Sequence, residues 1–407
     1  MALPLADPQF WIVTGAGLVA LAFVLRRLFR RPSKNALPCA HCSKAGKPGH
    51  PRAASGPGPK SVLLALASCA LAPGGGSALR ADVVERDVAA MGTRLALVIG
   101  NVDRPTGLAA SAAIVAAVED AERRLSTWRE ASELQGFNSA PPATRVALSP
   151  FAWNAIGTAL ACWEETGGAF DPTVAPLVEV WGLRAAGRVP NEAEIEAARR
   201  LVGAGRLVLD DEKRALVQTG GLRLEEGGFG KGAALESALN AVRAQAPVAE
   251  VELNFGGQLA WRGRTQPLKV LLADPRDRSR AVLELTLDAV AGSLSTTGDS
   301  ERKAVVGGVQ IGHLLDPRTG RPAPDIGSAT VFSAQATLAD CRSTGLFVLG
   351  EAEGVALMSR WSRERQAEAV LLLVEPNGLR ALVSPGLTAT ARALTPDLRI
   401  EAIAGSS

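Results

Sequence analysis

The sequence predicts a mixed α+β domain that follows a separate N-terminal segment. The chain has 407 residues, 47% of them hydrophobic, and its 44 basic and 41 acidic side chains nearly balance, so most of it can bury a core. Strand-like segments cluster between residues 205 and 333 with a single helical pattern among them, which favours α+β over regular βα alternation. The first seventy residues instead hold two apolar runs separated by a polar, basic stretch.

The predicted domain runs without interruption from residue 83 to about residue 400. It opens with an alternating pattern over residues 83–100 that is broken at Met91-Gly92-Thr93, and an alanine-rich helix follows at 109–125. Further helices are predicted at 149–165, 191–202, 231–246, 333–348 and 351–361. Strands are predicted at 206–210, 215–218, 222–225, 248–255, 268–273, 281–287, 303–306, 328–332 and 368–373.

The charge is divided unevenly along the chain. Residues 1–69 contain nine Lys and Arg and one acidic residue, a net charge of +8, which leaves 35 basic and 40 acidic residues, or −5, for the rest. An acidic body argues against nucleic acid as a partner, because phosphate contacts need a positive surface. Basic residues beside apolar runs indicate a membrane instead. Because the chain has three histidines, a His-rich metal centre is also excluded.

Residues 1–59 are predicted to form a transmembrane helix and a polar tail. Sixteen residues from Phe10 onward carry no charge and precede an arginine cluster, so a helix over about residues 10–29 can span a bilayer while the arginines snorkel. The tail contains one CxxC pair, Cys39 and Cys42, for which transient metal binding and an idle tail are both open. This segment resembles small Cys-rich membrane proteins that are linked to ferrous-iron transport.

Residues 60–82 are predicted to be a lipoprotein-type signal and a Gly-rich linker. Lys60 precedes an apolar run that ends in Leu66-Ala-Ser-Cys69, the form of a bacterial lipoprotein cleavage box, so we expect Cys69 to carry lipid. The domain after it would then face away from the cytoplasm. Such a signal normally lies at the very start of a chain, so a fusion and a true start near Lys60 are both open.

A glycine-rich loop, Gly227-Gly-Phe-Gly-Lys231-Gly232, lies between a predicted strand and a predicted helix. Backbone N–H groups at a helix start favour a phosphate, and Lys231 adds a positive charge. A Walker P-loop is excluded, because Gly232 follows the lysine and Glu225 occupies the place of the first glycine. A relaxed dinucleotide fingerprint also fits. The alternative is that the glycines allow tight packing.

Two oxygen-bearing side chains lie four residues apart on the predicted helix 333–348. Asp340 and Thr344 therefore share one helix face, and a carboxylate with a hydroxyl suits a hard cation such as Mg²⁺. The alternative is a solvated helix face, which the apolar residues 346–349 disfavour. Elsewhere, His313 precedes an Asp-Pro turn and Asp171 is expected to cap a helix that starts at Pro172.

The order of these segments resembles a known family over residues 83–370. The segments are Met91-Gly-Thr93, Leu125–Arg129, Ser132–Leu134, Phe137-Asn138, Phe170–Val174, Trp181-Gly182, Gly227–Gly232, Leu253–Gly257, Thr297–Asp299, His313–Gly320 and Leu338–Thr344. They resemble the FAD:protein FMN transferases, or ApbE-type flavin transferases. Members of this family are often exported lipoproteins, in agreement with the prediction for Cys69.

The resemblance implies an α/β-roll-type fold that moves FMN from FAD to a Thr or Ser hydroxyl of a partner protein and releases AMP. It implies FAD contacts at Met91, Trp128, Ala169, Phe170, Asp171, Glu225, Lys231 and Leu314. It implies Mg²⁺ on Asp340, Thr344 and the carbonyl of Gly228. Our candidate catalytic residues are Asp340 and His313. We expect the acceptor to carry an FMN-binding domain of a membrane electron-transfer system. The expected location is the bacterial inner membrane, with the catalytic domain facing the periplasm.

The chemistry implied is attack of a hydroxyl on phosphorus, for which His313 is the candidate base because its ordinary pKa of about 6.5 suits proton acceptance. Four positions depart from the family pattern: Glu225 and Glu236 replace Asp, Gln258 replaces Asp, and Gly312 replaces a histidine. Longer or missing carboxylates can misplace reacting groups. Two alternatives therefore stay open, an Mg²⁺-dependent FAD pyrophosphatase and a flavin-binding lipoprotein without turnover.

Overall fold

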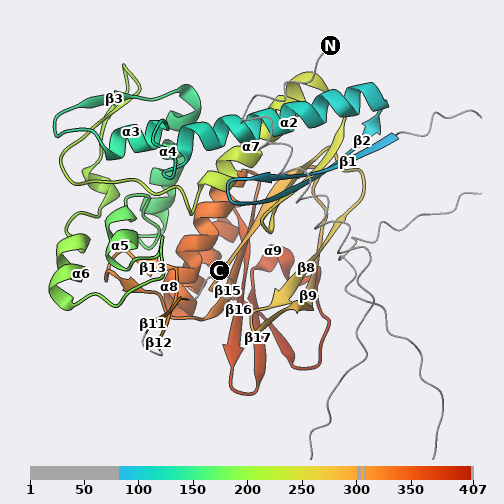
Figure 1. Ribbon diagram of the computed structural model, residues 1–407. Helices are drawn as coiled ribbons and strands as arrows, with labels where there is room; N and C mark the ends of the chain where they lie inside the picture. Colours follow the sequence, from blue (N-terminus) through green and yellow to red (C-terminus); the bar gives the residue numbers. More distant parts are fainter. Residues whose placement is uncertain (1–81, 300–303, 307–308, 405–407) are drawn as a thin grey trace, which may run out of the picture. The chain divides into compact units, whose positions relative to one another are not determined.

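The computed structural model describes residues 82–299, 304–306 and 309–404 (Figure 1). The chain divides into two units, residues 1–75 and 76–407, and all described residues belong to the second. The predicted transmembrane helix and the lipidation site Cys69 lie outside the described residues. Within the described ranges, every helix is too short or too polar to cross a bilayer.

The centre of the domain is a nine-stranded sheet. Its strands lie in the spatial order β1 (Asp82–Ala90), β2 (Thr93–Val102), β6 (Glu250–Phe255), β7 (Gln258–Arg262), β10 (Gly292–Gly298), β15 (Gly327–Ser333), β16 (Glu368–Glu375), β17 (Gly378–Val383) and β19 (Leu398–Ala402). All neighbouring strands are antiparallel except β17 and β19, which are parallel. This arrangement confirms the predicted mixed α and β architecture.

Three helices cover one face of this sheet: α2 (Arg104–Leu125), α7 (Gly230–Gln245) and α8 (Ala336–Arg363) (Figure 1). Alternate residues of β2 and β6 point toward them, as the two-residue period of a strand requires. The apolar cluster between the layers is built from Leu95, Leu97, Ile99, Val251, Leu253 and Phe255 of the sheet and Ile114, Val118, Leu235 and Val242 of the helices. In the helix layer, α7 and α8 lie side by side, and both carry predicted site residues.

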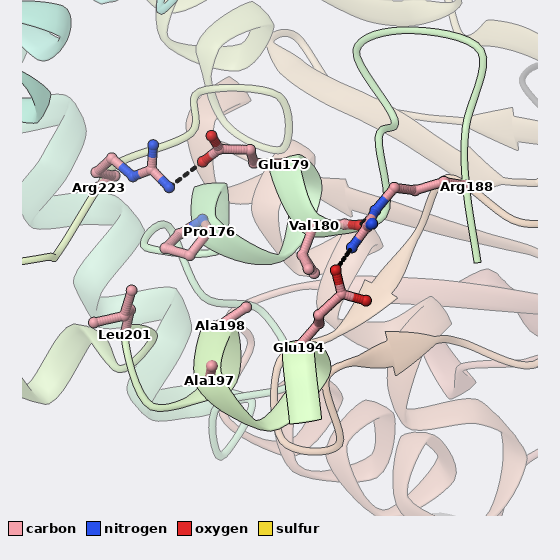
Figure 2. Close-up of a pocket in the computed structure, with 9 residues that line it drawn as sticks. All are labelled: Pro176, Glu179, Val180, Arg188, Glu194, Ala197, Ala198, Leu201 and Arg223. Carbon is pink, nitrogen blue, oxygen red and sulfur yellow. Dashed lines mark hydrogen bonds and ion pairs between the residues drawn. The ribbon is translucent and has the colours of Figure 1, made fainter. Parts of the chain in front are cut away.

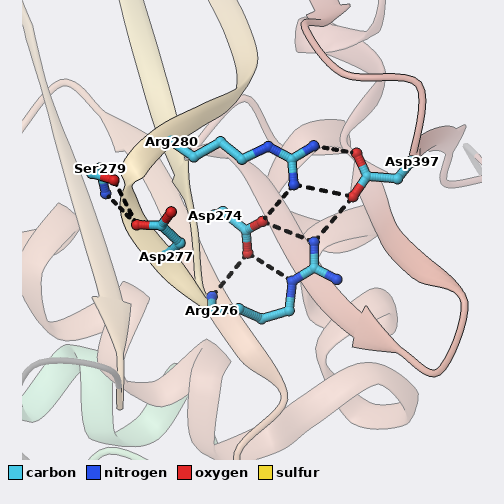
Figure 3. Close-up of polar contacts among 6 residues, drawn as sticks. All are labelled: Asp274, Arg276, Asp277, Ser279, Arg280 and Asp397. Carbon is cyan, nitrogen blue, oxygen red and sulfur yellow. Dashed lines mark hydrogen bonds and ion pairs between the residues drawn. The ribbon is translucent and has the colours of Figure 1, made fainter. Parts of the chain in front are cut away.

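A three-stranded sheet of β8 (Leu268–Asp274), β9 (Asp277–Leu287) and β18 (Ala391–Ala393) contributes to a second apolar cluster with other strands of the main sheet. Four charged side chains, Asp274, Arg276, Arg280 and Asp397, tie the tip of the β8–β9 hairpin to the C-terminal segment (Figure 3). Hydrogen bonding from Arg276 is the main reason that the pKa of the buried Asp274 is lowered.

A helical lobe lies beside the first half of α8 (Figure 1). It contains α3 (Glu133–Asn138), α4 (Pro150–Glu165), α5 (Ala175–Val180), α6 (Glu192–Arg199), a 3-10 turn at Ala204–Arg206, and a small sheet of β3 (Arg145–Ala147), β5 (Ala215–Val217) and β4 (Val208–Asp210). Two short hairpins, β11 (Ala304–Val306) with β12 (Val309–Ile311) and β13 (Leu315–Asp316) with β14 (Arg321–Pro322), and the short helix α9 (Pro385–Thr388) complete the described elements.

Three predicted elements, two helices and a strand, differ from the structure. The helices expected at 333–348 and 351–361 form one continuous element, α8, which bends at Gly350 because that residue has a φ of 68°. The prediction of a strand at 222–225 is wrong, because this segment forms only an isolated bridge, between Arg223 and Val174. This extended segment nevertheless leads directly into the glycine-rich loop.

Candidate active site

The start of α7 meets the first turns of α8 at Asp340. One carboxylate oxygen, Oδ2, accepts the backbone N–H of Gly232 at 2.9 Å, and Oδ1 lies 3.6 Å from Nζ of Lys231. The N-cap residue of α7, Phe229, offers no side-chain hydrogen bond, so Asp340 satisfies one of the free donors of the first turn. The positive end of the α7 dipole and Lys231 therefore both face a buried carboxylate.

Thr344 lies one turn further along α8, beside the glycine-rich loop. A Cβ on Gly228 would lie 3.0 Å from Cε2 of Phe170 and 3.3 Å from Oγ1 of Thr344, so the loop backbone packs directly on both side chains. The Thr344 hydroxyl donates to the carbonyl of Asp340 at 3.2 Å. Thr297 of β10 lies 3.5 Å from the same hydroxyl, so the structure brings Gly228, Asp340 and Thr344 into one region.

The glycines of the loop serve close packing. A Cβ on Gly232 would clash with the carbonyl oxygen of Ala336, so the approach of α7 to α8 requires glycine there. None of the four loop glycines has a positive φ. The two interpretations of this loop are therefore compatible: the glycines allow close packing, and the packing directs the start of α7 toward Asp340.

Glu225 leads into this loop and pairs with Arg184. The pKa of the Glu225 carboxyl is raised to about 7, mainly by burial and also by the neighbouring Glu226, while Arg184 opposes the rise. The Arg184 guanidinium also lies 4.8 Å from the centre of the Trp128 ring, which is 66% exposed. Trp128 and Glu225, both expected to contact FAD, are therefore joined by one arginine.

His313 lies in the loop before β13, and a buried carboxylate holds it. Its Nδ1 is 2.8 Å from Oδ1 of Asp299, which also accepts the His313 backbone N–H at 2.9 Å. A Cβ on Gly312 would clash with Oδ2 of the same aspartate, so glycine at this position makes room for it. The histidine ring thus has a fixed orientation with Nε2 directed away from this partner.

Asp171 does not cap a helix, because α5 starts at Ala175 without a side-chain cap. The carboxylate of Asp171 instead accepts the backbone N–H groups of Thr173 at 2.7 Å and Ala204 at 3.0 Å. Burial is the main cause of its raised pKa. This aspartate fixes the loop that carries Phe170.

The remaining predicted FAD contacts lie around the same region. Met91 occupies the tight β1–β2 turn with φ of 45°, and a Cβ on Gly230 would lie 3.4 Å from its Cε, so the turn reaches the start of α7. Ala169 and Leu314 both belong to the apolar cluster beneath α8. Ala169 is almost fully buried, backbone included, so it offers little surface to a ligand in this structure.

Comparison with known proteins places this geometry in a family. The model of the ApbE family matches residues 91–371, which is 281 of the 407 residues. The chain belongs to the ApbE family. A relative from Klebsiella pneumoniae named FAD:protein FMN transferase is 29% identical over 305 residues, which cover 72% of this chain and 85% of the relative. One of the same name from Salmonella typhimurium is 30% identical, with 64% and 76% covered.

Solved structures of the ApbE family share the fold. The ApbE protein of Thermotoga maritima has 29% sequence identity and a TM-score of 0.66, and the match covers 72% of this chain and 94% of that one. The flavinyl transferase ApbE of Pseudomonas stutzeri has 25% identity and a TM-score of 0.65, with 74% and 95% covered. The expected ApbE-like fold of the domain is therefore confirmed.

The ApbE family implies Mg²⁺, and the donors at the α7–α8 junction fit it. The described residues contain no cluster of three or more His, Cys, Asp or Glu side chains that could enclose a metal ion. One carboxylate, one hydroxyl and a backbone carbonyl are hard oxygen donors, and Mg²⁺ is commonly held by one or two carboxylates together with waters and substrate phosphates. Asp340, Thr344 and Gly228 supply such a set.

Two departures from the ApbE pattern have structural roles at the start of α8. Oε2 of Glu236 accepts the hydroxyl of Thr337 at 2.8 Å, and Nε2 of Gln258 donates to the carbonyl of Ala336 at 2.9 Å. The Oε1 atom of Gln258 is buried without a partner. Both side chains therefore hold the helix that carries Asp340.

Sequence reasoning missed Arg184 and the role of Asp299. Asp299 belongs to a motif of the ApbE pattern, and its position 14 residues before His313 gave no sign of their contact. Arg184 is 41 residues from Glu225 and lies in no recognised motif. Only the fold brings these partners together.

A separate groove lies between α5 and α6 (Figure 2). Its floor is apolar, and ion pairs between Arg223 and Glu179 and between Arg188 and Glu194 lie at its rim (Figure 2). The lining residues are Pro176, Glu179, Val180, Arg188, Glu194, Ala197, Ala198, Leu201 and Arg223. None of the residues expected to bind FAD or metal lines this groove.

Proposed function

We propose that this protein transfers FMN from FAD to a Thr or Ser hydroxyl of an acceptor protein, with Mg²⁺ bound and AMP released. The relatives named FAD:protein FMN transferase support the reaction. The observation that carries it on this chain is the junction where Lys231, the start of α7 and Thr344 surround Asp340. These groups suit a pyrophosphate and a hard cation together.

The reaction forms one P–O bond and breaks another. The acceptor hydroxyl oxygen attacks the phosphorus of the FMN half, the bond to the bridging oxygen breaks, and AMP leaves with the electron pair. Negative charge on the phosphates must be balanced while this happens, and bound Mg²⁺ would supply Lewis-acid stabilisation. Lys231 adds a fixed cation beside Asp340, and the first turn of α7 adds backbone donors.

His313 is the proposed acceptor of the hydroxyl proton. Asp299 lies 2.8 Å from Nδ1, so when Nδ1 carries the proton, the Asp299 carboxylate accepts a hydrogen bond from Nδ1–H, and Nε2 has a free lone pair. A neutral histidine in that tautomer can take the proton from the attacking hydroxyl. A buried aspartate beneath the ring then stabilises the cation that results.

One reaction mixture separates this proposal from its two alternatives. The full chain is incubated with FAD, Mg²⁺ and a purified FMN-binding domain from a membrane electron-transfer protein. In-gel flavin fluorescence on the acceptor with equimolar AMP is the expected result. Free FMN with AMP would indicate an FAD pyrophosphatase, and bound, unchanged FAD would indicate a flavin-binding protein without turnover.

We also propose that the domain is anchored outside the cytoplasm through lipid on Cys69. Lys60, the apolar run after it and the Leu66–Cys69 box support this location. Cleavage before Cys69 would separate the domain from the helix expected near residues 10–29, so this helix would anchor only an unprocessed precursor in the inner membrane. An acceptor that belongs to a membrane electron-transfer system would then be held on the same surface.

A further inference from the structure

We propose that Arg184 is a positioning residue of the FAD site, which holds the Trp128 indole and the Glu225 carboxylate as one wall against which an aromatic ring of FAD stacks. This inference rests on the proposed function, because it requires that the domain binds FAD. It adds a residue that no motif of the sequence identifies.

The first support is the contact between Arg184 and Trp128. The guanidinium lies 4.8 Å from the ring centre, within the range of a cation–π interaction. The indole is 66% exposed although tryptophan is usually well buried, so much of its surface is open to a planar ligand. An exposed ring is mobile unless something supports it, and the guanidinium beside it limits that motion.

The second support is the set of hydrogen bonds from the same guanidinium. Nη1 donates to the carbonyl of Thr127 at 3.2 Å, and Nη2 contacts both the Thr127 hydroxyl and the Glu225 carboxylate. The Thr127 hydroxyl in turn donates to Oε2 of Glu226 at 2.5 Å. A single side chain thereby joins the turn after α2 to the segment that enters the glycine-rich loop.

The third support is electrostatic. Glu226 is adjacent to Glu225 and buried, and its carboxylate disfavours the charge of Glu225. Arg184 opposes this repulsion, since it lowers the pKa of Glu225 that burial raises. Without the arginine this repulsion would be unopposed, and the Glu225 carboxylate would lose the ion pair that joins it to Trp128 through Arg184.

A second ion pair on the same segment provides a matched control. Arg223 lies two residues before Glu225 and pairs with Glu179 of α5, so it also joins this segment to the helical lobe. Both arginines are about one-third exposed. The contacts found for Arg223 do not include Thr127, Trp128 or Glu225, so its loss should affect the lobe without affecting the wall.

The test compares Arg184→Gln, Arg184→Lys and Arg223→Gln in the full chain by calorimetric titration of FAD, riboflavin and ADP. We expect Arg184→Gln to weaken FAD binding about tenfold and Arg223→Gln to leave it within twofold. Arg184→Lys should be intermediate, because an ammonium keeps the charge but lacks the planar fork. In turnover, the KM for FAD should rise while kcat at saturating FAD stays within about twofold.

The two half-ligands show which ring the wall holds. If it holds the flavin, riboflavin should lose the same factor as FAD while ADP is unaffected, and if it holds the adenine the reverse should be seen. Trp128→Ala combined with Arg184→Gln should weaken FAD binding by less than the product of the two single effects, since both act on one wall.

Three results would overturn the proposal: unchanged FAD affinity in Arg184→Gln, equal losses for riboflavin and ADP, or an equal loss in Arg223→Gln. A thermal melt of each variant shows whether an equal loss comes from a destabilised fold. If the wild-type chain itself does not bind FAD, the proposed function is wrong. The wild-type titration alone therefore tests the proposed function, and the variants test the role of Arg184.

Discussion

At the scale of single residues, Asp340 combines two interactions that mutagenesis can separate. Its Oδ2 accepts the N–H of Gly232, which is a structural contact at the start of α7. Its Oδ1 faces Lys231 and belongs to the proposed metal site. Asparagine keeps one acceptor for the helix N–H but removes the charge that a cation needs, whereas alanine removes both.

Asp340→Asn should therefore lower Mg²⁺-dependent AMP release by roughly a hundredfold or more, because the charge stabilisation that a metal supplies amounts to several kcal/mol. Thr344→Ala should be milder, since it removes only a neutral ligand. Release is measured by chromatography of AMP at limiting Mg²⁺, with circular dichroism as the control for folding. Equal release by Asp340→Asn and wild type would show that Asp340 is not a metal ligand.

Lys231→Ala should weaken FAD binding by roughly ten- to a hundredfold, because a charge-assisted contact contributes about 1.5–3 kcal/mol. The loss should shrink as salt rises, since the missing contribution is electrostatic. Riboflavin, which has no phosphates, should bind mutant and wild type alike in the same fluorescence titration. If riboflavin affinity falls together with FAD affinity, Lys231 supports the fold and not the phosphates.

Glu225 makes the free energy of unfolding depend on pH. Its pKa is about 7 in the fold against 4.5 for a free side chain, so the folded state favours the neutral acid. The contribution of the Glu225 carboxyl to the free energy of unfolding is therefore fully present below pH 4.5 and is lost as the pH rises through 7. Glu225→Gln should then stabilise the protein by about 1–3 kcal/mol at pH 8 and have little effect at pH 4.5. Urea unfolding at the two pH values would contradict this if the mutant is less stable at pH 8.

Residues whose neighbours follow from the helical period could be placed correctly from the sequence alone. Asp340 and Thr344 fall on one face of α8 because four residues are about one helical turn, and Lys231 lies in the first turn of α7, which begins at Gly230. Arg184 and Asp299 could not be predicted in their roles, since their contacts depend on how distant segments pack.

At the scale of elements, the first turn of α8 determines where Asp340 lies. Gly232 of α7, Glu236 of α7 and Gln258 of β7 all contact residues 336–337, the first two residues of this helix. Three contacts from two elements thus fix the register between α7 and α8. The departures at Glu236 and Gln258 therefore belong to a packing contact at the start of α8.

Gly232→Ala should destabilise the domain by about 1–3 kcal/mol, because its Cβ would clash with the carbonyl oxygen of Ala336 and push the two helices apart. Gly157→Ala in the middle of α4 is the matched control. No atom lies within 4 Å of a Cβ there, so alanine should stabilise by roughly 0.5–1 kcal/mol. Chemical denaturation of both variants measures the difference, and a neutral Gly232→Ala would show that the helices are not in close contact.

Some strands had no recognisable pattern in the sequence. β10 reads Gly-Ser-Leu-Ser-Thr-Thr-Gly, which is polar and bounded by glycines, yet Ser293 and Ser295 are buried against β7 and α8. Hydroxyl groups satisfied by neighbouring elements allow such a strand to lie in a core, and no alternation reveals this. Apolar segments such as residues 368–373 were predicted correctly because their burial follows from composition.

At the scale of the whole molecule, the nine-stranded, mostly antiparallel sheet supports α7 and α8, which carry the site. Residues from the β1–β2 turn, the helical lobe and the end of β10 reach it from separate parts of the chain: Met91, Phe170 and Thr297. The fold class followed from the clustering of strands between residues 205 and 333. The strand order could not be derived, because pairings such as β10 with β15 join segments with no sequence signal for each other.

The net charge also separates the molecule into two parts with different expected surroundings. Residues 1–69 carry +8 and the rest carries −5, so the basic part suits an anionic membrane surface.

If Cys69 receives lipid, Cys69→Ser should leave an unprocessed precursor with a higher mass, seen by mass spectrometry of the N-terminus. Alkaline extraction of membranes should release little of this precursor if the helix near residues 10–29 also spans the bilayer. Processing and membrane fraction equal to wild type would show that Cys69 is not lipidated and that the upstream helix alone anchors the domain.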